Sequence, residues 1–354
     1  MKGLVLSGGY GVRLRPLTYS QQKQLIPVVN KPILFYALED IINAGIKDVG
    51  IIVGPNKEQV MDCVESRQWK ADIEFIYQEE PLGLAHAVKI SKDFIGTEPF
   101  VMYLGDNILK GGILDHVNEF LNSSSTDASI LLCKVPNPQQ FGVAKLNEKG
   151  DVIQLLEKPK EPPSNLALVG VYLFRPVIFE AVKNIKPSWR NELEITDAIQ
   201  WLISNGYKVK SATVDGWWKD TGKTEDILDA NRLVLDELVP ENNGLVEKEV
   251  ILKGRIKIGE ESVIKGKTVI KGPIIVGENC VIQDSYIGPY TSIGNNCKIV
   301  NTEIEDSIIM DGSVVESCSR IVDSLIGKNV KVKKSKKLPE GYRLVVGDYS
   351  EVEI

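Results

Sequence analysis

A branched aliphatic residue recurs at every sixth position in the last third of the chain, and this period limits the possible folds. The series runs through Ile258, Ile264, Ile270, Val276 and Ile282, and it resumes after a one-residue slip at Ile287, Ile293 and Ile299. A second series lies one residue earlier, at Val263, Val269, Ile275 and Val281. An antiparallel sandwich would alternate with a period of two, whereas a period of six is typical of a parallel β-helix, whose stacked coils bury one shared core. We therefore predict a parallel β-helix.

Before this repeat, up to about residue 215, short apolar strands alternate with amphipathic helices. Strand candidates are KGLVL, VGIIVG, IEFIYQ, FVMYLGD and ASILLCKV. Helix candidates are KPILFYALEDIINAG, with Asn30 as its cap, Pro32 in its first turn and Gly45 after its end, and also ITDAIQWLISNG and KTEDILDANRLVLDEL. Such alternation indicates a mostly parallel sheet covered by helices on both faces. VPENNG at 239–244 is a predicted linker, so we expect domains at 1–240 and 245–335 and a tail at 336–354.

Charge and hydropathy exclude several kinds of partner. The 354 residues include 42 basic and 48 acidic residues, a net charge of −6, and the one short basic run is KVKKSKK. Nucleic acid is therefore not an expected partner. No apolar run reaches the roughly 18 residues of a membrane span, and no signal peptide is visible. The five cysteines are widely spaced without a C-x-x-C pair, which is typical of reduced thiols, so we expect a cytoplasmic protein with no membrane partner.

The segment GLVLSGGYGVRLRPLT, residues 3–18, places a glycine-rich turn directly after an apolar strand. It does not match G-x-G-x-x-G, because Leu14 stands at the third glycine position, and no Gly-Lys-Ser/Thr of a P-loop follows. The turn alone could be a plain tight turn. Arg13, Arg15 and Lys23, however, add fixed positive charge to the backbone N–H groups, and this combination binds triphosphates. The segment therefore predicts a phosphate site.

Further motifs along the chain occur in the order found in a known enzyme family. They are GGYGVRLRPLT, KQLIPVVNKPILFY, QEEPLGLAHAV, YLGDN, FGVAKL, LEKPKEP, GVYLF, ELEITD, WWKDTGKTEDIL and the closing GDYSEVEI. With these motifs the chain resembles the sugar-1-phosphate nucleotidylyltransferases, and more closely the long form of glucose-1-phosphate thymidylyltransferase. The resemblance implies an α/β fold with a Rossmann-like (GT-A-like), mixed, mostly parallel sheet, followed by a C-terminal left-handed parallel β-helix of hexapeptide repeats.

The resemblance also implies a reaction, in which dTTP and glucose 1-phosphate give dTDP-glucose and pyrophosphate for dTDP-rhamnose biosynthesis. The attacking sugar phosphate is already anionic at neutral pH, since the second pKa of a phosphomonoester is about 6, so no general base is needed. The family motifs place Arg13 and Lys23 at the triphosphate and Lys158 at the sugar phosphate as catalytic cations. They place Mg²⁺ on Asp106 of LGDN and Asp220 of KDTG, because this hard cation prefers carboxylate and phosphate oxygens.

The same motifs imply binding roles for a larger set of residues. The nucleotide-binding positions are Leu6, Gly8, Gly9, Gln24, Gln78, Gly83 and Asp106, and the sugar-phosphate-binding positions are Gly142, Glu157, Lys158, Gly170 and Tyr172. An amide such as that of Gln24 or Gln78 can pair with both the carbonyl and the N–H of a pyrimidine edge. The carboxylate of Glu157 would accept hydrogen bonds from sugar hydroxyls.

Two residues of the glycine-rich turn depart from the thymidylyltransferase pattern. Val12 replaces the usual threonine, and Tyr10 is more typical of mannose-1-phosphate guanylyltransferases, although Gln24 favours a pyrimidine base. Two alternatives therefore stay open: the same reaction with UTP or GTP and another sugar 1-phosphate, and a non-catalytic regulatory subunit that binds a sugar nucleotide. Non-catalytic relatives typically lose the loop arginine or the metal aspartates, which this chain keeps, so an enzyme is favoured.

The expected role of the β-helix follows from its lack of histidine. Some hexapeptide β-helices are acetyltransferases, and that chemistry generally uses a histidine base. Residues 240–354 contain no histidine, since His86 and His116 both precede them. We expect the β-helix to serve assembly into a homo-oligomer, or docking onto the first domain, instead of a second reaction.

Overall fold

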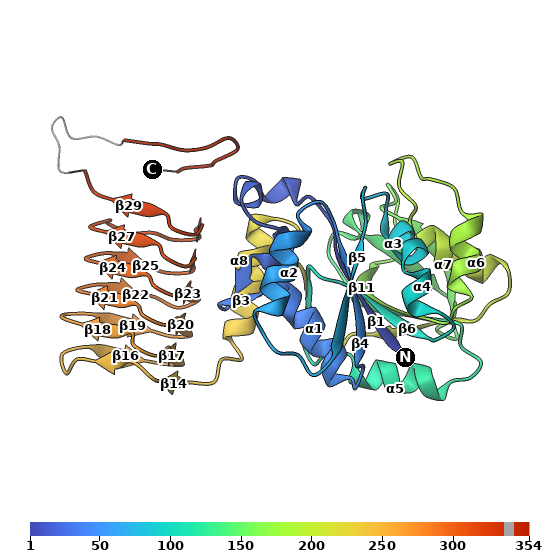
Figure 1. Cartoon of the computed structure of the whole chain (residues 1–354), viewed down its shortest axis with the longest axis horizontal. Coiled ribbons are helices and arrows are strands. Elements are labelled where there is room, and N and C mark those ends of the chain that lie inside the picture. Colours follow the sequence, from blue (N-terminus) through green and yellow to red (C-terminus); the bar gives the residue numbers. More distant parts are fainter. Residues whose placement is uncertain (336–342, 354) are drawn as a thin grey trace. The chain divides into compact units, whose positions relative to one another are not determined.

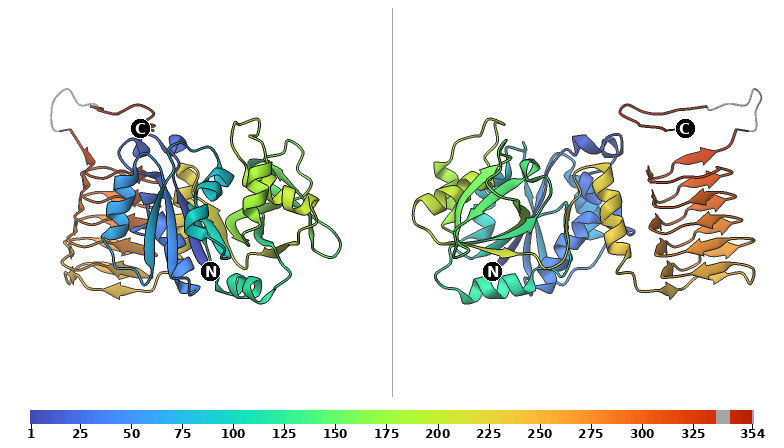
Figure 2. Two further views of the ribbon diagram at one scale, coloured as in Figure 1. Left: turned by 45° about the vertical axis from the view of Figure 1, so that its right-hand side comes forward. Right: turned by 180° about the vertical axis from the view of Figure 1, so that it is seen from behind.

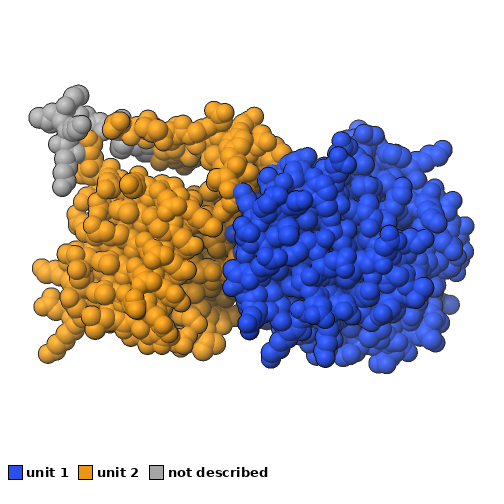
Figure 3. All heavy atoms as spheres, in the orientation of Figure 1, with its two compact units in different colours: residues 1–10, 22–25, 33–220 blue, residues 11–21, 26–32, 221–354 orange. Residues whose placement is uncertain are grey.

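The computed structural model describes residues 1–335 and 343–353 and contains two compact units. Unit 1 comprises residues 1–10, 22–25 and 33–220, and unit 2 comprises residues 11–21, 26–32 and 221–354, as Figure 3 shows. Unit 2 therefore contains two segments of the N-terminal motif region. The predicted tail at 336–354 lies in part, at 336–342 and 354, outside the described residues. The domain limits at 240 and 245 stay predictions.

A nine-stranded mixed sheet forms the centre of unit 1 (Figure 1). Its order is β10-β9-β11-β6-β1-β4-β5, and β8 pairs with both β11 and β12. Neighbours within β6-β1-β4-β5 are parallel, whereas β11 runs antiparallel to β6 and to β8. The strands are β1 (Lys2–Ser7), β4 (Asp48–Val53), β5 (Asp72–Tyr77), β6 (Phe100–Leu104), β8 (Ala128–Lys134), β9 (Gly142–Leu146), β10 (Val152–Glu157), β11 (Leu166–Phe174) and β12 (Val209–Thr213).

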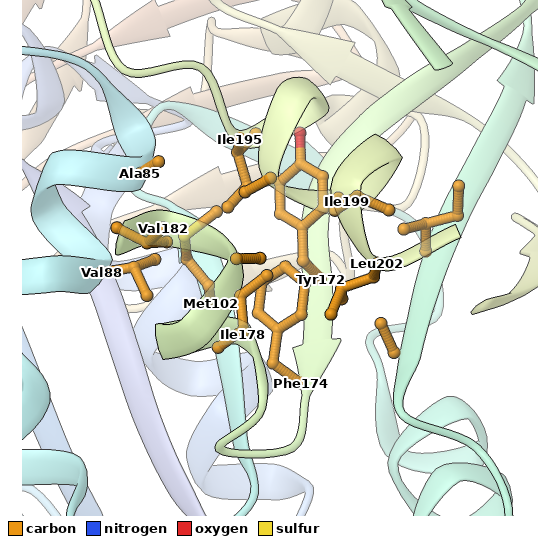
Figure 4. Packing of buried hydrophobic residues seen from close by; sticks show 14 of the residues in the cluster. Ala85, Val88, Met102, Tyr172, Phe174, Ile178, Val182, Ile195, Ile199 and Leu202 are labelled. Atoms are coloured by element: carbon orange, nitrogen blue, oxygen red, sulfur yellow. The ribbon is translucent and has the colours of Figure 1, made fainter. Parts of the chain in front are cut away.

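Side chains of β1 alternate between two hydrophobic cores, because successive residues of a strand point to opposite faces of a sheet. Leu4 and Leu6 lie in the core formed with α3 (Leu84–Ile90), α4 (Lys92–Ile95), α6 (Ile178–Asn184) and α7 (Ile195–Ser204), part of which Figure 4 shows. Val5 lies in the core formed with α1 (Ile33–Asn43), α2 (Lys57–Glu65) and α5 (Leu114–Asn122). The predicted sheet covered by helices on both faces is therefore confirmed. Among the described residues, no helix combines the length and apolarity that crossing a membrane requires.

The predicted elements of the first 240 residues are present, with one local difference. The five strand candidates correspond to β1, β4, β5, β6 and β8, and the helix candidates to α1, α7 and α8 (Thr224–Leu235). Gly45 follows α1 with a φ of 83°, as predicted. The predicted helix cap is wrong: β2 (Pro27–Val28) pairs with β3 (Lys31–Pro32), and Asn30 lies in the turn between them with a φ of 59°. A hairpin therefore replaces the first helical turn.

Unit 2 contains the predicted parallel β-helix, whose coils are stacked in Figure 2. Its sides are three parallel sheets, with orders β14-β17-β20-β23-β26-β28, β15-β18-β21-β24-β27-β29 and β16-β19-β22-β25. Ile258 pairs with Val276, so one coil is three hexads long, and Val276 pairs with Ile293, so the one-residue slip shortens the next coil. The predicted fold class is confirmed. The predicted linker already contains β14, which pairs with β17.

The strands of the β-helix are short. They are β14 (Glu241–Asn242), β15 (Leu245–Val246), β16 (Ile251–Lys253), β17 (Ile256–Ile258), β18 (Val263–Lys265), β19 (Val269–Lys271), β20 (Ile274–Val276), β21 (Val281–Gln283), β22 (Tyr286–Ile287), β23 (Thr291–Ile293), β24 (Lys298–Val300), β25 (Glu303–Ile304), β26 (Ile308–Ile309), β27 (Val314–Glu316), β28 (Leu325–Ile326) and β29 (Lys331–Lys333). The two aliphatic series of the sequence separate by depth. The series from Ile258 to Ile299 is fully buried, whereas the series from Val263 to Val281 is only partly buried.

Small polar side chains connect successive coils at the turns. The Ser285 hydroxyl oxygen accepts a hydrogen bond from the backbone N–H of Thr302 at 3.2 Å. The Thr302 hydroxyl oxygen in turn accepts one from the N–H of Cys318 at 3.3 Å, and the Ser262 hydroxyl oxygen accepts one from the N–H of Cys280 at 2.9 Å. These side chains satisfy backbone groups that the short strands leave without a ladder partner.

Asn231 of α8 links three parts of unit 2. Its Oδ1 accepts hydrogen bonds from the backbone N–H of Val29 at 3.0 Å and from the Ser292 hydroxyl at 2.7 Å, and its Nδ2 donates to the Tyr290 carbonyl at 3.0 Å. The side chain is buried, so these bonds satisfy an amide that would otherwise be costly to bury. The adjacent Arg232 pairs with the carboxylates of its own helix and of the β-helix, Asp229, Asp306 and Asp323. Helix α8 and the 26–32 hairpin are thereby fixed to the β-helix.

Candidate active site

The glycine-rich turn begins at the carboxyl end of β1, the edge where open α/β sheets bind ligands. Gln22 fixes its first residues, because its Nε2 donates hydrogen bonds to the carbonyls of Ser7 at 3.1 Å and Gly9 at 2.7 Å. A Cβ atom on Gly8 would lie 3.1 Å from Oε1 of Gln78, so the glycine permits this close approach. The sequence did not single out Gln22, which is one of three glutamines in SQQKQL and carries no distinguishing spacing.

The rest of the turn, residues 11–21, belongs to unit 2 and carries Arg13. The turn continues as the 3₁₀ helix η1 (Val12–Leu14), which follows Gly11 with a φ of 61°. Leu14 is buried, whereas the Arg13 side chain is exposed and forms no ion pair with any residue that the structure describes. An exposed guanidinium beside backbone N–H groups suits the binding of an anion. The other two predicted catalytic cations, Lys23 and Lys158, lie in unit 1.

Lys23 and Asp106 form the central ion pair of unit 1. Lys23 lies in the 3₁₀ helix η3 (Lys23–Leu25), is only 7% exposed, and places its Nζ 2.5 Å from Oδ2 of Asp106. Asn107 donates from Nδ2 to Oδ1 of the same carboxylate at 2.8 Å. Burial acts to raise the pKa of Asp106, but the charge and hydrogen bond of Lys23 and the hydrogen bond of Asn107 lower it below its usual value. Asp106 is therefore ionised at neutral pH.

The strand pair β7 (Asn107–Leu109) and β13 (Trp218–Asp220) contains the second predicted metal ligand, Asp220. The antiparallel register sets Asp220 opposite Asn107, the residue after Asp106. Trp218 of the same strand donates from Nε1 to Oδ1 of Asn107 at 2.6 Å. The indole thus orients the amide that in turn holds Asp106. The sequence did not single out Trp218, which has no motif role beyond its place in WWKDTG.

Asp106 and Asp220 have the chemistry that a magnesium site requires. No group of three or more His, Cys, Asp or Glu side chains placed to hold a metal occurs among the described residues. Mg²⁺ commonly binds through one or two carboxylates and takes its other ligands from water and substrate phosphates. Asp106 immediately precedes β7 and Asp220 ends β13, the strand paired with β7, and their binding of Mg²⁺ stays a prediction.

The predicted base-reading glutamines are both buried. Oε1 of Gln24 has no hydrogen-bond partner among the described residues, and a buried acceptor of this kind is costly unless a ligand satisfies it. Nε2 of Gln78 donates to Nδ1 of His86 at 2.9 Å. Burial, and then the charge of Lys89, lower the pKa of His86, so its imidazole is neutral and can accept this bond.

Gly83 precedes α3 in a conformation that favours glycine. Its φ is 104°, and a Cβ atom would lie 2.4 Å from the carbonyl oxygen of Leu193. The chain there is held on both sides, because Leu193 donates to the Leu82 carbonyl and accepts from the Ala85 N–H. Any larger residue at position 83 would displace the chain between Gln78 and His86 or the backbone of Leu193.

Three of the predicted sugar-phosphate residues lie on or directly after the paired strands β9 and β10. Gly142 of β9 pairs with Glu157 of β10, and a Cβ on Gly142 would lie 2.9 Å from Thr196 and 3.2 Å from Oε2 of Glu157. Lys158 follows with a φ of 43°, a left-handed conformation that is unfavourable for lysine. Its N–H is held by the Phe141 carbonyl at 3.1 Å, and its side chain is partly exposed, with Nζ 3.8 Å from Oε1 of Glu157.

Arg190 neutralises part of the charge around Glu157. Its Nη1 lies 3.4 Å from Oε1 of Glu157, and its other nitrogens bind the carboxylates of Glu192 and Glu194. Burial raises the pKa of Glu157, an effect that Lys158 and Arg190 oppose and Glu194 reinforces. The motif ELEITD, which contains Glu192 and Glu194, was recognised in the sequence. The sequence did not indicate that Arg190 contacts Glu157, which lies 33 positions earlier in the chain.

Gly170 and Tyr172 of β11 have close packing partners. A Cβ on Gly170 would lie 2.7 Å from Leu104. Tyr172 is only 4% exposed, and Figure 4 shows its ring within the core, near Ile199 and Phe174. Burial, and then the charge of Glu157, raise the pKa of Tyr172. Both residues therefore have a packing role, and their contact with a sugar stays a prediction.

Comparison with known proteins relates this arrangement to a family. Residues 2–237 match the model of the nucleotidyl transferase family, and residues 270–353 match that of the GMPPB C-terminal domain. A Haloferax volcanii protein named low-salt glycan biosynthesis nucleotidyltransferase Agl11 is 49% identical, with 100% of both chains covered. The glucose-1-phosphate thymidylyltransferase of Streptomyces antibioticus is 50% identical over 100% of this chain and 99% of its own length.

A solved structure agrees with this relationship. A putative glucose-1-phosphate thymidylyltransferase from Bacillus anthracis, in complex with a sucrose, aligns with a TM-score of 0.61 and 37% identity, covering 66% of this chain and 94% of that one. The family predicted from the motifs is confirmed, because the family model matches most of the chain and the relatives extend over all of it. The chain belongs to the nucleotidyl transferase family.

Proposed function

We propose that the chain is a glucose-1-phosphate thymidylyltransferase, which converts dTTP and glucose 1-phosphate to dTDP-glucose and pyrophosphate. The observation that carries the proposal is the ionised Asp106, held by Lys23 and Asn107 beside the strand that ends with Asp220. This is a group of charges suited to phosphoryl chemistry. The similarity of 50% over the full chain to the Streptomyces antibioticus enzyme supports the choice of substrates.

The reaction needs positioning and charge stabilisation more than proton transfer. An oxygen of the sugar phosphate attacks the α-phosphorus of dTTP in line, the bond between this phosphorus and the bridging oxygen to the β-phosphate breaks, and pyrophosphate leaves. The nucleophile carries its negative charge before it binds, since its second pKa is about 6. A neutral His86 that is engaged with Gln78 is consistent with a site that uses no histidine base.

Charged side chains would stabilise the substrates before and during transfer. Asp106 and Asp220 would hold Mg²⁺, which when bound supplies positive charge to the phosphate oxygens. Arg13, exposed and without an ion pair among the described residues, would bind the triphosphate. Lys23 would also bind the triphosphate, and Lys158 would bind the sugar phosphate.

Selectivity would depend on buried polar groups. Oε1 of Gln24, which no group in the described part of the chain hydrogen-bonds, would accept a hydrogen bond from the thymine N–H, and Gln78 would contact the same base edge. A site built around a buried acceptor discriminates strongly against ligands that leave it unsatisfied. Glu157, held by Thr196 and Arg190, would accept from sugar hydroxyls.

A coupled pyrophosphate assay tests the proposal and its alternatives together. Each of dTTP, UTP, GTP and CTP is combined with several sugar 1-phosphates in the presence of Mg²⁺. The proposal predicts the highest kcat/KM for dTTP with glucose 1-phosphate. A higher value for UTP or GTP with another sugar would establish the first alternative, and sugar-nucleotide binding without turnover would establish the regulatory subunit.

Other features of the proposal rest on the sequence. Assembly into a homo-oligomer, a place in the cytoplasm and a role in dTDP-rhamnose biosynthesis stay predictions. The expected absence of nucleic acid and membrane partners rests on the net charge of −6 and on the apolar runs.

A further inference from the structure

The segment 11–21, which carries Arg13, contacts the C-terminal part of the chain at three places within unit 2. Nε2 of Gln21 lies 3.5 Å from the sulfur of Met310. Leu17 lies against Gly327, where a Cβ atom would be 3.2 Å from the leucine Cδ2. The third contact is made by Tyr349, in the described part of the C-terminal tail. Residues more than 280 positions apart in the chain are thus neighbours.

Tyr349 completes an aromatic enclosure around Arg15. The Arg15 guanidinium lies 4.8 Å from the centre of the Tyr19 ring and 5.7 Å from that of the Tyr349 ring. The two ring centres are 6.1 Å apart and tilted by 46°. Such distances are those of cation–π contacts. Tyr349 is 70% exposed, so burial contributes little to its position, and its ring contacts Arg15 and Tyr19.

The internal hydrogen bonds of the segment are local: the N–H groups of Arg15, Tyr19 and Ser20 each donate to the carbonyl three residues earlier, at 3.4, 3.1 and 3.4 Å. The segment consists of two 3₁₀ turns, η1 and η2 (Leu17–Tyr19). The N–H of Leu14 and the hydroxyl of Thr18 both donate to the Gly11 carbonyl, at 2.9 Å and 2.8 Å. Short 3₁₀ turns have poor hydrogen-bond geometry and little stability of their own. External contacts therefore contribute to the order of this segment.

We propose that Tyr349 is a positioning residue that orders the segment 11–21 for nucleoside triphosphate binding, by enclosing Arg15 together with Tyr19. The inference rests on the proposed function, because it assigns the segment to the triphosphate. It gives the C-terminal tail a part in substrate binding, in addition to the assembly role expected of the β-helix. A preordered segment loses less conformational entropy when it binds its ligand.

The test compares Tyr349→Ala with Tyr349→Phe, which keeps the ring, and with Val352→Ala as a control for an exposed tail residue outside the enclosure. Hydrogen exchange of peptides covering residues 11–21 is measured by mass spectrometry without substrate. KM for dTTP and kcat are measured separately. For Tyr349→Ala we expect about two- to fivefold faster exchange and a similar rise in KM for dTTP, the effect of losing one exposed cation–π contact. We expect kcat to stay near wild type and Tyr349→Phe to behave like wild type.

Each outcome decides the inference. The ordering role would be overturned if exchange in Tyr349→Ala equalled that of wild type. It would also be overturned if Tyr349→Phe and Val352→Ala accelerated exchange as much as Tyr349→Ala does. Faster exchange with an unchanged KM for dTTP would overturn the link to nucleotide binding. If the wild-type protein does not turn over dTTP and glucose 1-phosphate, the proposed function fails, and the exchange data still decide whether Tyr349 orders the segment.

Discussion

Replacing Asp106 with asparagine tests the ion pair at the centre of the site. Lys23 is 7% exposed and its Nζ lies 2.5 Å from Oδ2 of Asp106. Asparagine has the same shape as aspartate but no charge. If its oxygen keeps the hydrogen bond from Asn107, its amide group points at the Lys23 ammonium, and two donors then face each other. The variant should therefore lose the attraction of the pair and keep most of the packing.

The expected cost follows from burial. Removing one partner of a fully buried ion pair costs about 3–5 kcal/mol. The Asp106 side chain is 22% exposed, so water screens part of its charge. We therefore expect a loss of about 2–3 kcal/mol in the free energy of unfolding. This is a large share of the total stability of a typical domain.

The stability lost in Asp106→Asn should become smaller as the pH falls. The pKa of Asp106 is lowered in the folded protein from an unfolded value of 3.8. A carboxylate whose folded pKa is depressed stabilises the fold fully above its unfolded pKa and loses this contribution as the pH falls through its folded pKa. The difference between wild type and Asp106→Asn should therefore be constant near pH 7 and shrink below about pH 4.

The assay is urea unfolding followed by tryptophan fluorescence, with wild type, Asp106→Asn, Lys23→Met and the double variant forming a thermodynamic cycle. Urea is uncharged and leaves ion pairs unscreened. A coupling energy of at least about 1.5 kcal/mol at pH 7 would agree with the geometry, since contacting residues of one network couple by roughly 0.5–3 kcal/mol. A coupling energy near zero at pH 7 would show that the Lys23–Asp106 pair does not stabilise the fold.

Three other variants test the surroundings of the site and the attachment of α8. Trp218→Phe removes the donor to Asn107 and leaves a buried acceptor unsatisfied, so kcat/KM should fall about tenfold; an unchanged value in the pyrophosphate assay would contradict the orienting role. Arg190→Ala removes a cation that opposes the burial-raised pKa of Glu157, so the acid limb of 1/KM for glucose 1-phosphate should move to higher pH, and coincident pH profiles would be evidence against it. Asn231→Ala removes three buried hydrogen bonds and should lower the free energy of unfolding by about 2–4 kcal/mol; thermal denaturation at the wild-type temperature would show that the network is dispensable.

The sequence predicted the β-helix core well because the hexad period is set directly by the geometry of a coil. Ile258 and Val276 are three hexads apart in the sequence and are neighbours in the sheet. The polar contacts of the same unit were not predictable in this way. Whether Asn30 caps a helix or turns a hairpin depends on which distant segment satisfies it, and its Nδ2 donates to the Ile293 carbonyl at 2.6 Å.

In the candidate site, too, some residues were found from sequence motifs and others only from tertiary contacts. Motif resemblance selected Lys23, Asp106 and Asp220 as candidates, and the pairing of β7 with β13 sets Asp220 opposite Asn107, more than 100 positions away in the chain. It did not identify Gln22 or Trp218, whose importance depends on single hydrogen bonds to Gly9 and Asn107 across the fold. Such bonds depend on tertiary structure, which local sequence patterns do not encode.

The proposed reaction transfers the thymidylyl group of dTTP to glucose 1-phosphate, and nucleotide labelled at the α-phosphate follows this group into the product. The protein is incubated with dTTP labelled at the α-phosphate, glucose 1-phosphate and Mg²⁺, and the products are separated. We expect labelled dTDP-glucose in equal amount to pyrophosphate, and near loss of both in Asp106→Asn and Asp220→Asn variants that remain folded. No labelled sugar nucleotide from the folded wild-type protein, or full activity in both variants, would contradict it.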